Sequence, residues 1–143
     1  MQDVDHLIKG ILTCKDMASS RPLLLLVLLS LAEAQLAVFD LRATGLRSGL
    51  LGTPDAYVTV FSGSTSLGKT SVHRNNRNPW WEDEFSSYEA QVNEVLRLEV
   101  HDSDVGFDDL LGSCQRQIKE GTHQHDCFLE GGGTLHYSYT LYT

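Results

Sequence analysis

The chain has 143 residues and carries 19 acidic against 11 basic side chains, which gives a formal net charge of −8 at pH 7. This balance argues against nucleic acid as a partner, because phosphate binding needs a basic face. Once the N-terminal segment described next is set aside, the length leaves room for one compact domain and excludes a second domain of similar size.

The N-terminal segment predicts a secretory signal. From Met17 the chain has a positively charged start, then a leucine-rich run at Leu23–Leu31, then small residues at Ala32–Ala34. This order is typical of a signal peptide that is cleaved before Gln35. The apolar run is shorter than the about 20 residues that a membrane-spanning helix needs. Residues 17–34 are therefore predicted to be a signal peptide.

A signal sequence normally starts at the initiator methionine, so Met17 is the expected start of the protein. Residues 1–16 are mixed in charge and are interpreted as a leader or a gene-model extension. Residues 35–143 are expected to form the secreted, extracellular domain.

Short apolar runs recur through the rest of the chain, separated by Gly, Ser, Asn and Pro. Helical periodicity is weak, and only Tyr88–Glu94 is expected to form a brief helical turn. Regularly spaced short strands of this kind predict an all-β fold, an antiparallel sandwich of eight strands in two sheets. The predicted strands are Leu36–Leu41, Ala56–Phe61, Leu67–Val72, Trp80–Phe85, Val95–Val100, Leu110–Gln115, His123–Leu129 and Leu135–Tyr142.

An acidic loop, DSDVGFDDLLG, follows the predicted strand at Val95–Val100. Carboxylates crowded on one loop repel one another unless a cation compensates. Calcium suits such a loop because it accepts six to eight oxygens in flexible geometry, and Gly106 lets the chain turn back toward its start. The sequence therefore predicts a calcium site formed by Asp102, Asp104, Asp108 and Asp109.

Two other interpretations apply to an acidic loop of this kind. An EF-hand is excluded, because its sixth and twelfth loop positions require glycine and glutamate, and those places hold Phe107 and Ser113. A solvated acidic turn without a ligand stays open. An enzyme is not expected, because the predicted domain lacks a nucleophile elbow, a glycine-rich phosphate loop and an organised His-acid-Ser set.

One cysteine pair and one histidine pair are further candidate sites. Cys14 lies in the segment expected to be lost, and Cys114 and Cys127 flank a short hairpin-like segment, so a disulfide is expected in an oxidising compartment. His123 and His125 alternate on a predicted strand and could bind a transition metal, but no third ligand is evident in the sequence.

Three motifs carry a resemblance to a known family: TPDAYVTV at Thr53–Val60, NRNPWWEDEF at Asn76–Phe85 and LRLEVHDSDVGFDDLLGSC at Leu96–Cys114. Together they resemble the C2 domain, a β-sandwich that binds calcium and phospholipid. Within that family they are most similar to the C-terminal C2 domain of the perforin family, whose pore-forming domain the chain is too short to contain.

The resemblance implies a ligand set. Asp55 matches a ligand in the first loop of C2 domains, and Asp102, Asp104 and Asp109 match ligands in the third loop, with Asp108 as an auxiliary acid. Gly49 stands where these domains usually place another aspartate. The loss of one carboxylate should weaken calcium binding, because affinity follows the charge count of the ligands.

The resemblance also implies a function. We expect a monomeric, secreted module that binds anionic or zwitterionic phospholipid membranes when calcium is bound, with a role in immune defence. Four apolar residues near the loop tips are expected to contact the membrane, namely Leu50, Leu51, Val105 and Phe107. Packing of Leu50 and Leu51 against the sandwich remains an alternative. The alternative function, favoured by Gly49, is a calcium-independent protein-interaction domain.

Overall fold

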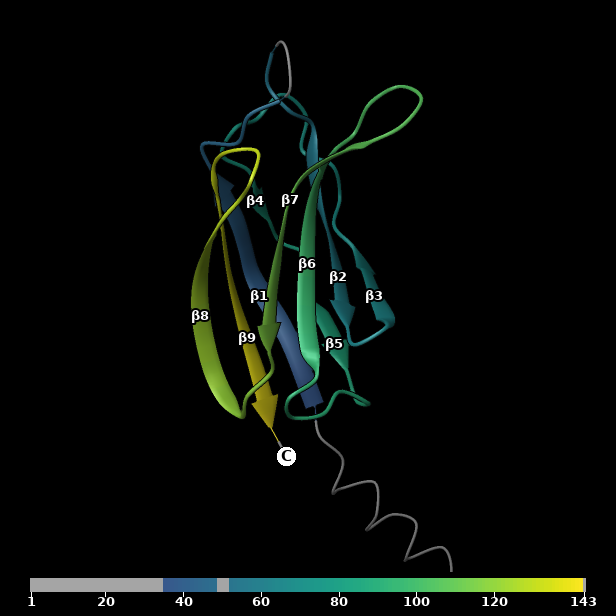
Figure 1. Cartoon of the computed structure of the whole chain (residues 1–143), viewed down its shortest axis with the longest axis vertical. Coiled ribbons are helices and arrows are strands. Elements are labelled where there is room, and N and C mark those ends of the chain that lie inside the picture. Colours follow the sequence, from purple (N-terminus) through teal and green to yellow (C-terminus); the bar gives the residue numbers. More distant parts are fainter. Residues whose placement is uncertain (1–34, 49–51, 143) are drawn as a thin grey trace, which may run out of the picture. The chain divides into compact units, whose positions relative to one another are not determined.

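The computed structural model describes residues 35–48 and 52–142, which form nine β-strands (Figure 1). All strand pairings within this part of the chain are antiparallel. The strands are β1 (Gln35–Thr44), β2 (Ala56–Ser62), β3 (Thr65–Lys69), β4 (Trp80–Trp81), β5 (Phe85–Ser87), β6 (Val95–Asp102), β7 (Asp109–Gln117), β8 (Gly121–Phe128) and β9 (Thr134–Tyr142).

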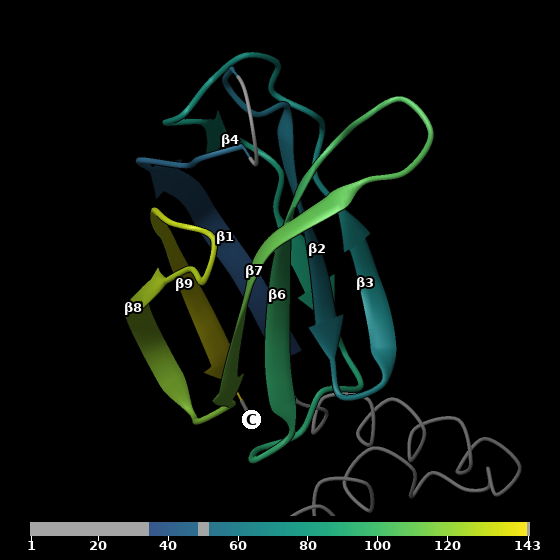
Figure 2. The same ribbon diagram turned by 45° about the horizontal axis from the view of Figure 1, so that its top comes forward.

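The strands form two sheets. One sheet has the order β4-β1-β9-β8, and β5 also pairs with β1. The other sheet has the order β3-β2-β6-β7. Figure 2 shows the two sheets as separate layers, with β7 and β8 at the same open side of the sandwich. The predicted all-β sandwich is confirmed.

The structure has one strand more than the sequence predicted, because the run Trp80–Phe85 is divided into β4 and β5. Both pieces pair with β1, one at each end of it. The residues between them, Glu82–Glu84, are three consecutive acids, and acidic residues are unfavourable in strands. The chain therefore leaves the sheet there and rejoins it.

The helical turn expected at Tyr88–Glu94 is wrong, because this segment forms bends and a turn. Asn93 has a positive φ of 75°, which a right-handed helix does not allow, and its N–H donates to the carbonyl oxygen of Ile118 at 2.7 Å. Nowhere in residues 35–48 and 52–142 is there a helix with the length and apolarity that a membrane crossing requires.

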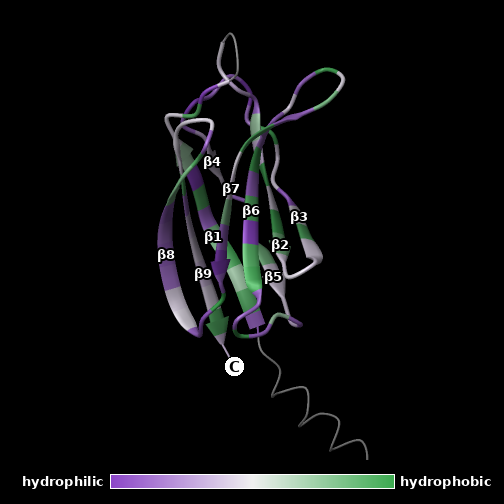
Figure 3. Ribbon diagram, in the orientation of Figure 1, coloured by the Kyte–Doolittle hydropathy of each residue, from purple (hydrophilic) through white to green (hydrophobic). Residues whose placement is uncertain are grey.

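The core lies between the two sheets and follows the alternation of side chains along each strand. In β6, every second residue is buried, beginning with Leu96 and continuing through Leu98 and Val100 to Asp102. The tryptophan pair divides in the same way, since Trp81 is buried and Trp80 is exposed. Figure 3 shows apolar and polar residues alternating along the strands. The inward-facing series of β6 thus ends in a carboxylate.

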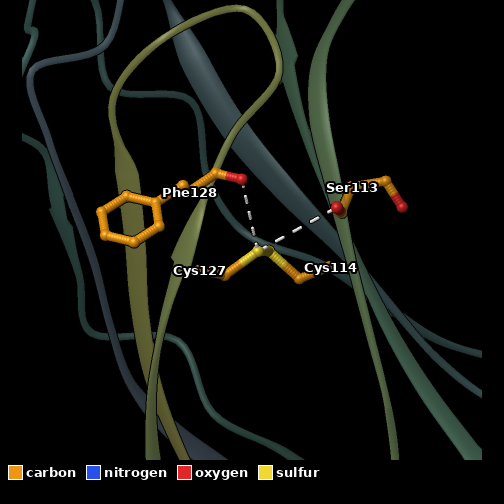
Figure 4. Close-up of a disulfide and its surroundings, with 4 residues drawn as sticks. All are labelled: Ser113, Cys114, Cys127 and Phe128. Carbon is orange, nitrogen blue, oxygen red and sulfur yellow. Dashed lines mark hydrogen bonds between the residues drawn. A yellow bond between two sulfur atoms is a disulfide. The ribbon is translucent and has the colours of Figure 1, made fainter.

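A disulfide joins Cys114 on β7 to Cys127 on β8 (Figure 4), with the two Cα atoms 6.2 Å apart. The sulfur of Cys127 also lies 4.0 Å from the carbonyl oxygen of Ser113 and 3.9 Å from that of Phe128. Because β7 and β8 are edge strands of different sheets, the bond links the two layers at their open side.

Candidate metal site

The predicted acids lie where three neighbouring strands of one sheet begin or end. β6 ends at Asp102, which pairs directly with Asp109, the first residue of β7. Asp55 immediately precedes β2, whose first residue, Ala56, pairs with Asp102 on its other side. Strand register therefore brings three carboxylates together from separate parts of the sequence. Figure 1 shows the β6–β7 loop and the segment that leads into β2 at the same end of the domain.

Asp102 occupies the centre of this arrangement and is buried. Its Oδ1 accepts a hydrogen bond of 2.9 Å from the backbone N–H of Asp55. In return, the N–H of Ser103 donates to the carbonyl oxygen of Asp55 at 2.8 Å. These bonds fix the two loops to each other. Burying a carboxylate is costly unless hydrogen bonds or a cation compensate it, so this position is suited to a cation.

The side chain of Asp55 is held from a third segment. Its Oδ1 accepts a hydrogen bond of 2.8 Å from the N–H of Asn75, and its Oδ2 lies 3.8 Å from Nη1 of Arg74. The Arg74 side chain is largely exposed, so this ion pair is screened by water and contributes little to stability. The hydrogen bond to Asn75 is what orients the carboxylate.

Asp104 experiences the repulsion expected of a crowded acidic loop. Loss of hydration raises its pKa, and the charge of Asp102, a hydrogen bond to Asp109 and the charges of Asp109 and Asp108 raise it further. A raised carboxyl pKa means that the ionised form is disfavoured by its surroundings. A bound cation would remove that penalty.

Asp108 faces a different set of partners. Its Oδ2 accepts a hydrogen bond from the hydroxyl of Tyr57, and its Oδ1 accepts one of 3.1 Å from the N–H of Asp104. These two bonds, the Tyr57 bond being the stronger influence, lower the pKa of Asp108. Burial first, and then Asp108, raise the pKa of Tyr57 to about 12. Asp108 thus holds the loop against β2.

The tip of the β6–β7 loop exposes apolar side chains beside these acids. Val105 is fully exposed and Phe107 is 75% exposed. Leu110, at the start of β7, is also exposed, although the sequence did not single it out. The other predicted membrane contacts, Leu50 and Leu51, lie outside the described residues, as does Gly49.

The donor set consists of oxygen atoms, which fits calcium better than zinc. Within residues 35–48 and 52–142, however, no group of three or more His, Cys, Asp or Glu side chains is arranged closely enough to hold a metal ion. The histidine pair predicted as a possible zinc site also has no third ligand in this part of the chain. The acids are brought to one end of the sandwich, and Asp108 accepts hydrogen bonds from both the hydroxyl of Tyr57 and the N–H of Asp104.

Sequence reasoning missed three residues that shape the site. Tyr57 could have been found, because it lies two residues after Asp55 and strand alternation places such residues on one face. Asn75 and Arg74 reach Asp55 from a loop without regular structure, and no periodic pattern points to them.

Comparison with known proteins identifies the class. The family model described as "C2 domain" matches residues 34–131, and the chain therefore belongs to the C2 domain family. A solved structure described as "Structure of a C2 domain" has a TM-score of 0.76 and 63% sequence identity, covering 77% of this chain and 99% of that chain.

Among curated proteins, the chain is similar to perforin-1 of Rattus norvegicus, with 37% identity over 102 residues. The match covers 69% of this chain and 18% of perforin-1, so the chain spans less than a fifth of that relative. It is also 35% identical over 82 residues to the "Calcium-dependent lipid-binding protein" of Arabidopsis thaliana, covering 56% of this chain and 16% of that protein. The predicted likeness to perforin is confirmed.

Proposed function

We propose that this C2 domain binds phospholipid membranes, anionic or zwitterionic, in a calcium-dependent manner. The observation that carries the proposal is the convergence of Asp55, Asp102 and Asp109 at three paired strand ends. The similarity to a plant protein named for calcium-dependent lipid binding supports it. The residues proposed to hold calcium are Asp55, Asp102, Asp104 and Asp109, with Asp108 as an auxiliary acid.

The chain's own residues prepare this end of the domain for a cation. The hydrogen bond from Asp55 to Asp102 holds the first and third loops in fixed relation. The repulsion at Asp104 leaves the loop with uncompensated negative charge, which would repel anionic lipid. Calcium, when bound, supplies positive charge and open coordination positions for phosphate oxygens.

The exposed side chains at the loop tip are proposed to enter the membrane interface. Phe107 and Val105 extend into solvent beside the acids, and Leu110 adds apolar surface at the base of the loop. Leu50 and Leu51 are proposed to contribute from the first loop. Burial of such side chains in the interface adds affinity once the loop charge is neutralised.

The test is co-sedimentation of the purified protein with phosphatidylserine liposomes, in calcium and in chelator. The variant Asp102→Asn, Asp104→Asn should bind calcium-loaded liposomes about 10- to 100-fold more weakly, because two negatively charged calcium ligands are lost. The matched control, Asp83→Asn with Glu84→Gln, removes two charges between β4 and β5 and should bind like the wild type. If the wild type sediments with the liposomes equally well in calcium and in chelator, the proposal is wrong.

A second candidate function is a calcium-independent protein-interaction domain. It is favoured by the lack of a closed group of metal-holding side chains in the described residues and by Gly49 in place of an aspartate. Calorimetric titration with calcium, with and without liposomes, separates the two functions. If the wild type releases or absorbs heat on calcium addition and the Asp102→Asn, Asp104→Asn variant does not, the calcium site is supported. If the wild type gives no heat with calcium, either with or without liposomes, the interaction domain is supported.

We further propose that the domain acts outside the cell as a monomer, after cleavage before Gln35, in immune defence. The signal-like sequence motivates the first part, and the similarity to perforin-1 motivates the last. Mass spectrometry of the protein collected from culture medium checks the processing. Any N-terminus other than one near Gln35 contradicts it.

A further inference from the structure

The open side of the sandwich carries a second polar region, which the proposed membrane function does not use. An open groove runs between the edge strands β7 and β8 and reaches β9 behind them. We call it the edge groove, and define it by Arg116, Lys119, His123, His125 and Tyr139.

The charge of the edge groove is opposite to that of the chain. The chain has a net charge of −8, yet among the described residues the groove is lined by two cationic side chains, two imidazoles and no carboxylate. Arg116 comes from β7, Lys119 from the turn after it, and both imidazoles from β8. Two cations from β7 and the turn after it therefore face the same space as two imidazoles from the other sheet.

Aromatic contacts form the inner surface of the groove. The rings of His123 and His125 are stacked with an interplanar angle of 4° and centroids 6.2 Å apart. Both also stack on Tyr139, at 4.9 Å and 5.9 Å between centroids. Tyr139 is buried in the core of its sheet, so the imidazoles rest on a rigid base.

The two cations are held in place by neutral partners. Arg116 lies near Tyr137 on β9, where it opposes the rise that burial causes in the pKa of the tyrosine hydroxyl. Nζ of Lys119 lies 2.5 Å from the Oδ1 of Asn93, and the N–H of Lys119 donates to the hydroxyl of Tyr139 at 3.0 Å. None of these contacts neutralises the positive charge, so it remains available to an anion.

The two imidazoles and Tyr139 differ in how their polar atoms are satisfied. Nε2 of His125 is buried and has no hydrogen-bond partner within the described residues, although most buried polar atoms in proteins have one. Nε2 of His123 donates to the carbonyl oxygen of Glu120 at 2.8 Å. The hydroxyl of Tyr139 accepts its bond from Lys119, so it keeps its own proton to donate.

We propose that the edge groove binds a phosphate group, carried by a soluble phosphate compound or by a lipid headgroup, without calcium. A tetrahedral phosphate accepts hydrogen bonds from several directions, and the fork of N–H groups on an arginine matches its oxygens. Figure 1 shows the turn between β7 and β8 at the end of the domain opposite the acidic loop. The groove is therefore a site separate from the calcium loops.

The pKa of His125 is sensitive to the charges around the groove. Burial first, and then the charges of Arg116 and His123, lower the pKa of His125, while Asp126 opposes them. A bound anion would favour the charged imidazole and raise this pKa. The other groups facing it are Lys119, Tyr137 and Tyr139.

The test is an NMR pH titration of the histidine side chains of the purified protein, with and without inorganic phosphate and with calcium chelated. Phosphate should raise the pKa of His125 and shift the His123 and His125 signals in a saturable way. The variant Arg116→Gln, Lys119→Gln should bind phosphate about tenfold more weakly or worse, because charge-assisted hydrogen bonds are lost. The control Arg42→Gln removes one positive charge elsewhere and should respond like the wild type.

A second experiment identifies the source of the phosphate, and a further variant provides a test that does not depend on the folding of the double variant. Vesicles containing phosphatidic acid, in chelator, replace inorganic phosphate. A response to inorganic phosphate supports a soluble ligand, and a response to the vesicles alone supports a lipid headgroup. The inference is overturned if neither probe produces a saturable shift, or if the double variant responds like the wild type. His123→Gln, which keeps both cations, should weaken binding less than the double variant does.

Discussion

The acidic loop end and the edge groove gather like charges in different ways. At the loop end, strand register places the acids side by side, and backbone N–H groups of Asp55, Asn75 and Asp104 donate to them. At the edge groove, side chains from both sheets meet, and the hydroxyl of Tyr139 and the side-chain amide of Asn93 accept hydrogen bonds from Lys119. At the loop end, the hydrogen bonds to the carboxylates come from backbone N–H groups. At the edge groove, the side chains that meet come from two different sheets. The edge groove should therefore depend more on the link between the layers.

The largest expected effect comes from removing that link. The double variant Cys114→Ser, Cys127→Ser should lose about 3 kcal/mol of stability, since its 13-residue separation closes a short loop in the unfolded chain. For a domain of this size that corresponds to a fall in Tm of about 10–20 °C, measured by calorimetry. NMR should show His123 and His125 disturbed more than Asp55 and Asp102.

A reducing agent provides the control for this variant. It should lower the Tm of the wild type and leave that of the double variant unchanged. If reduction does not alter the wild-type Tm, the two cysteines are not joined in solution.

The next effect sharpens the comparison at the loop end. Phe107→Ser should weaken calcium-dependent liposome binding by about tenfold or more, since burial of such a side chain is worth about 1.5–3 kcal/mol. The matched control is Tyr142→Ser, which removes another exposed aromatic from the last strand. Equal affinities of the two variants, measured by co-sedimentation, would place the membrane contact elsewhere.

The smallest effect concerns ionisation at the loop end. Asp108→Asn should lower the pKa of Tyr57 from about 12 toward its ordinary value of 10.0, though burial, the larger cause, keeps it above that value. Absorbance at alkaline pH, compared with a Tyr57→Phe variant, measures this change. A Tyr57 pKa that stays the same would mean that Asp108 does not bond it in solution.

The same pair predicts how stability depends on pH. Because the pKa of Tyr57 is raised in the folded state, its contribution is present below pH 10 and is lost as the pH rises through about 12. The pKa of Asp108 is lowered, so its contribution is present above the ordinary carboxyl pKa and is lost as the pH falls through the folded value. Asp108→Asn should flatten both slopes in denaturant titrations at a series of pH values.

Much of the fold was predictable because it follows local alternation. The period of two in Val95–Val100 identified β6, and the same alternation, continued to Asp102, predicts that the acid faces inward. The three acids at Glu82–Glu84 are visible in the sequence, but the places where β4 and β5 pair with β1 on either side of them are not. There the register with β9 shifts between Phe39 and Arg42, around Asp40 with its positive φ of 54°.

The candidate site was predictable in part for a similar reason. Four of its acids lie in one loop, and a motif resemblance supplied Asp55. The contact between Asp108 and Tyr57 depends on how the loop folds back on β2, which spacing alone does not determine. The edge groove could not be predicted from the sequence. The sequence shows His123 and His125, but it does not show that Arg116 and Tyr139 lie beside them.

The pairing of the first strand with the last sets the order in which the domain can fold. β1 lies between β9 and the short strands β4 and β5, and it pairs with β9 along most of its length. The ladder between β1 and β9 cannot form until β9 has been synthesised. Contacts between residues so distant in sequence slow folding. Until then, β1 presents an unpaired apolar edge that favours aggregation. During synthesis, β1 therefore stays without its longest pairing partner until β9 has been made.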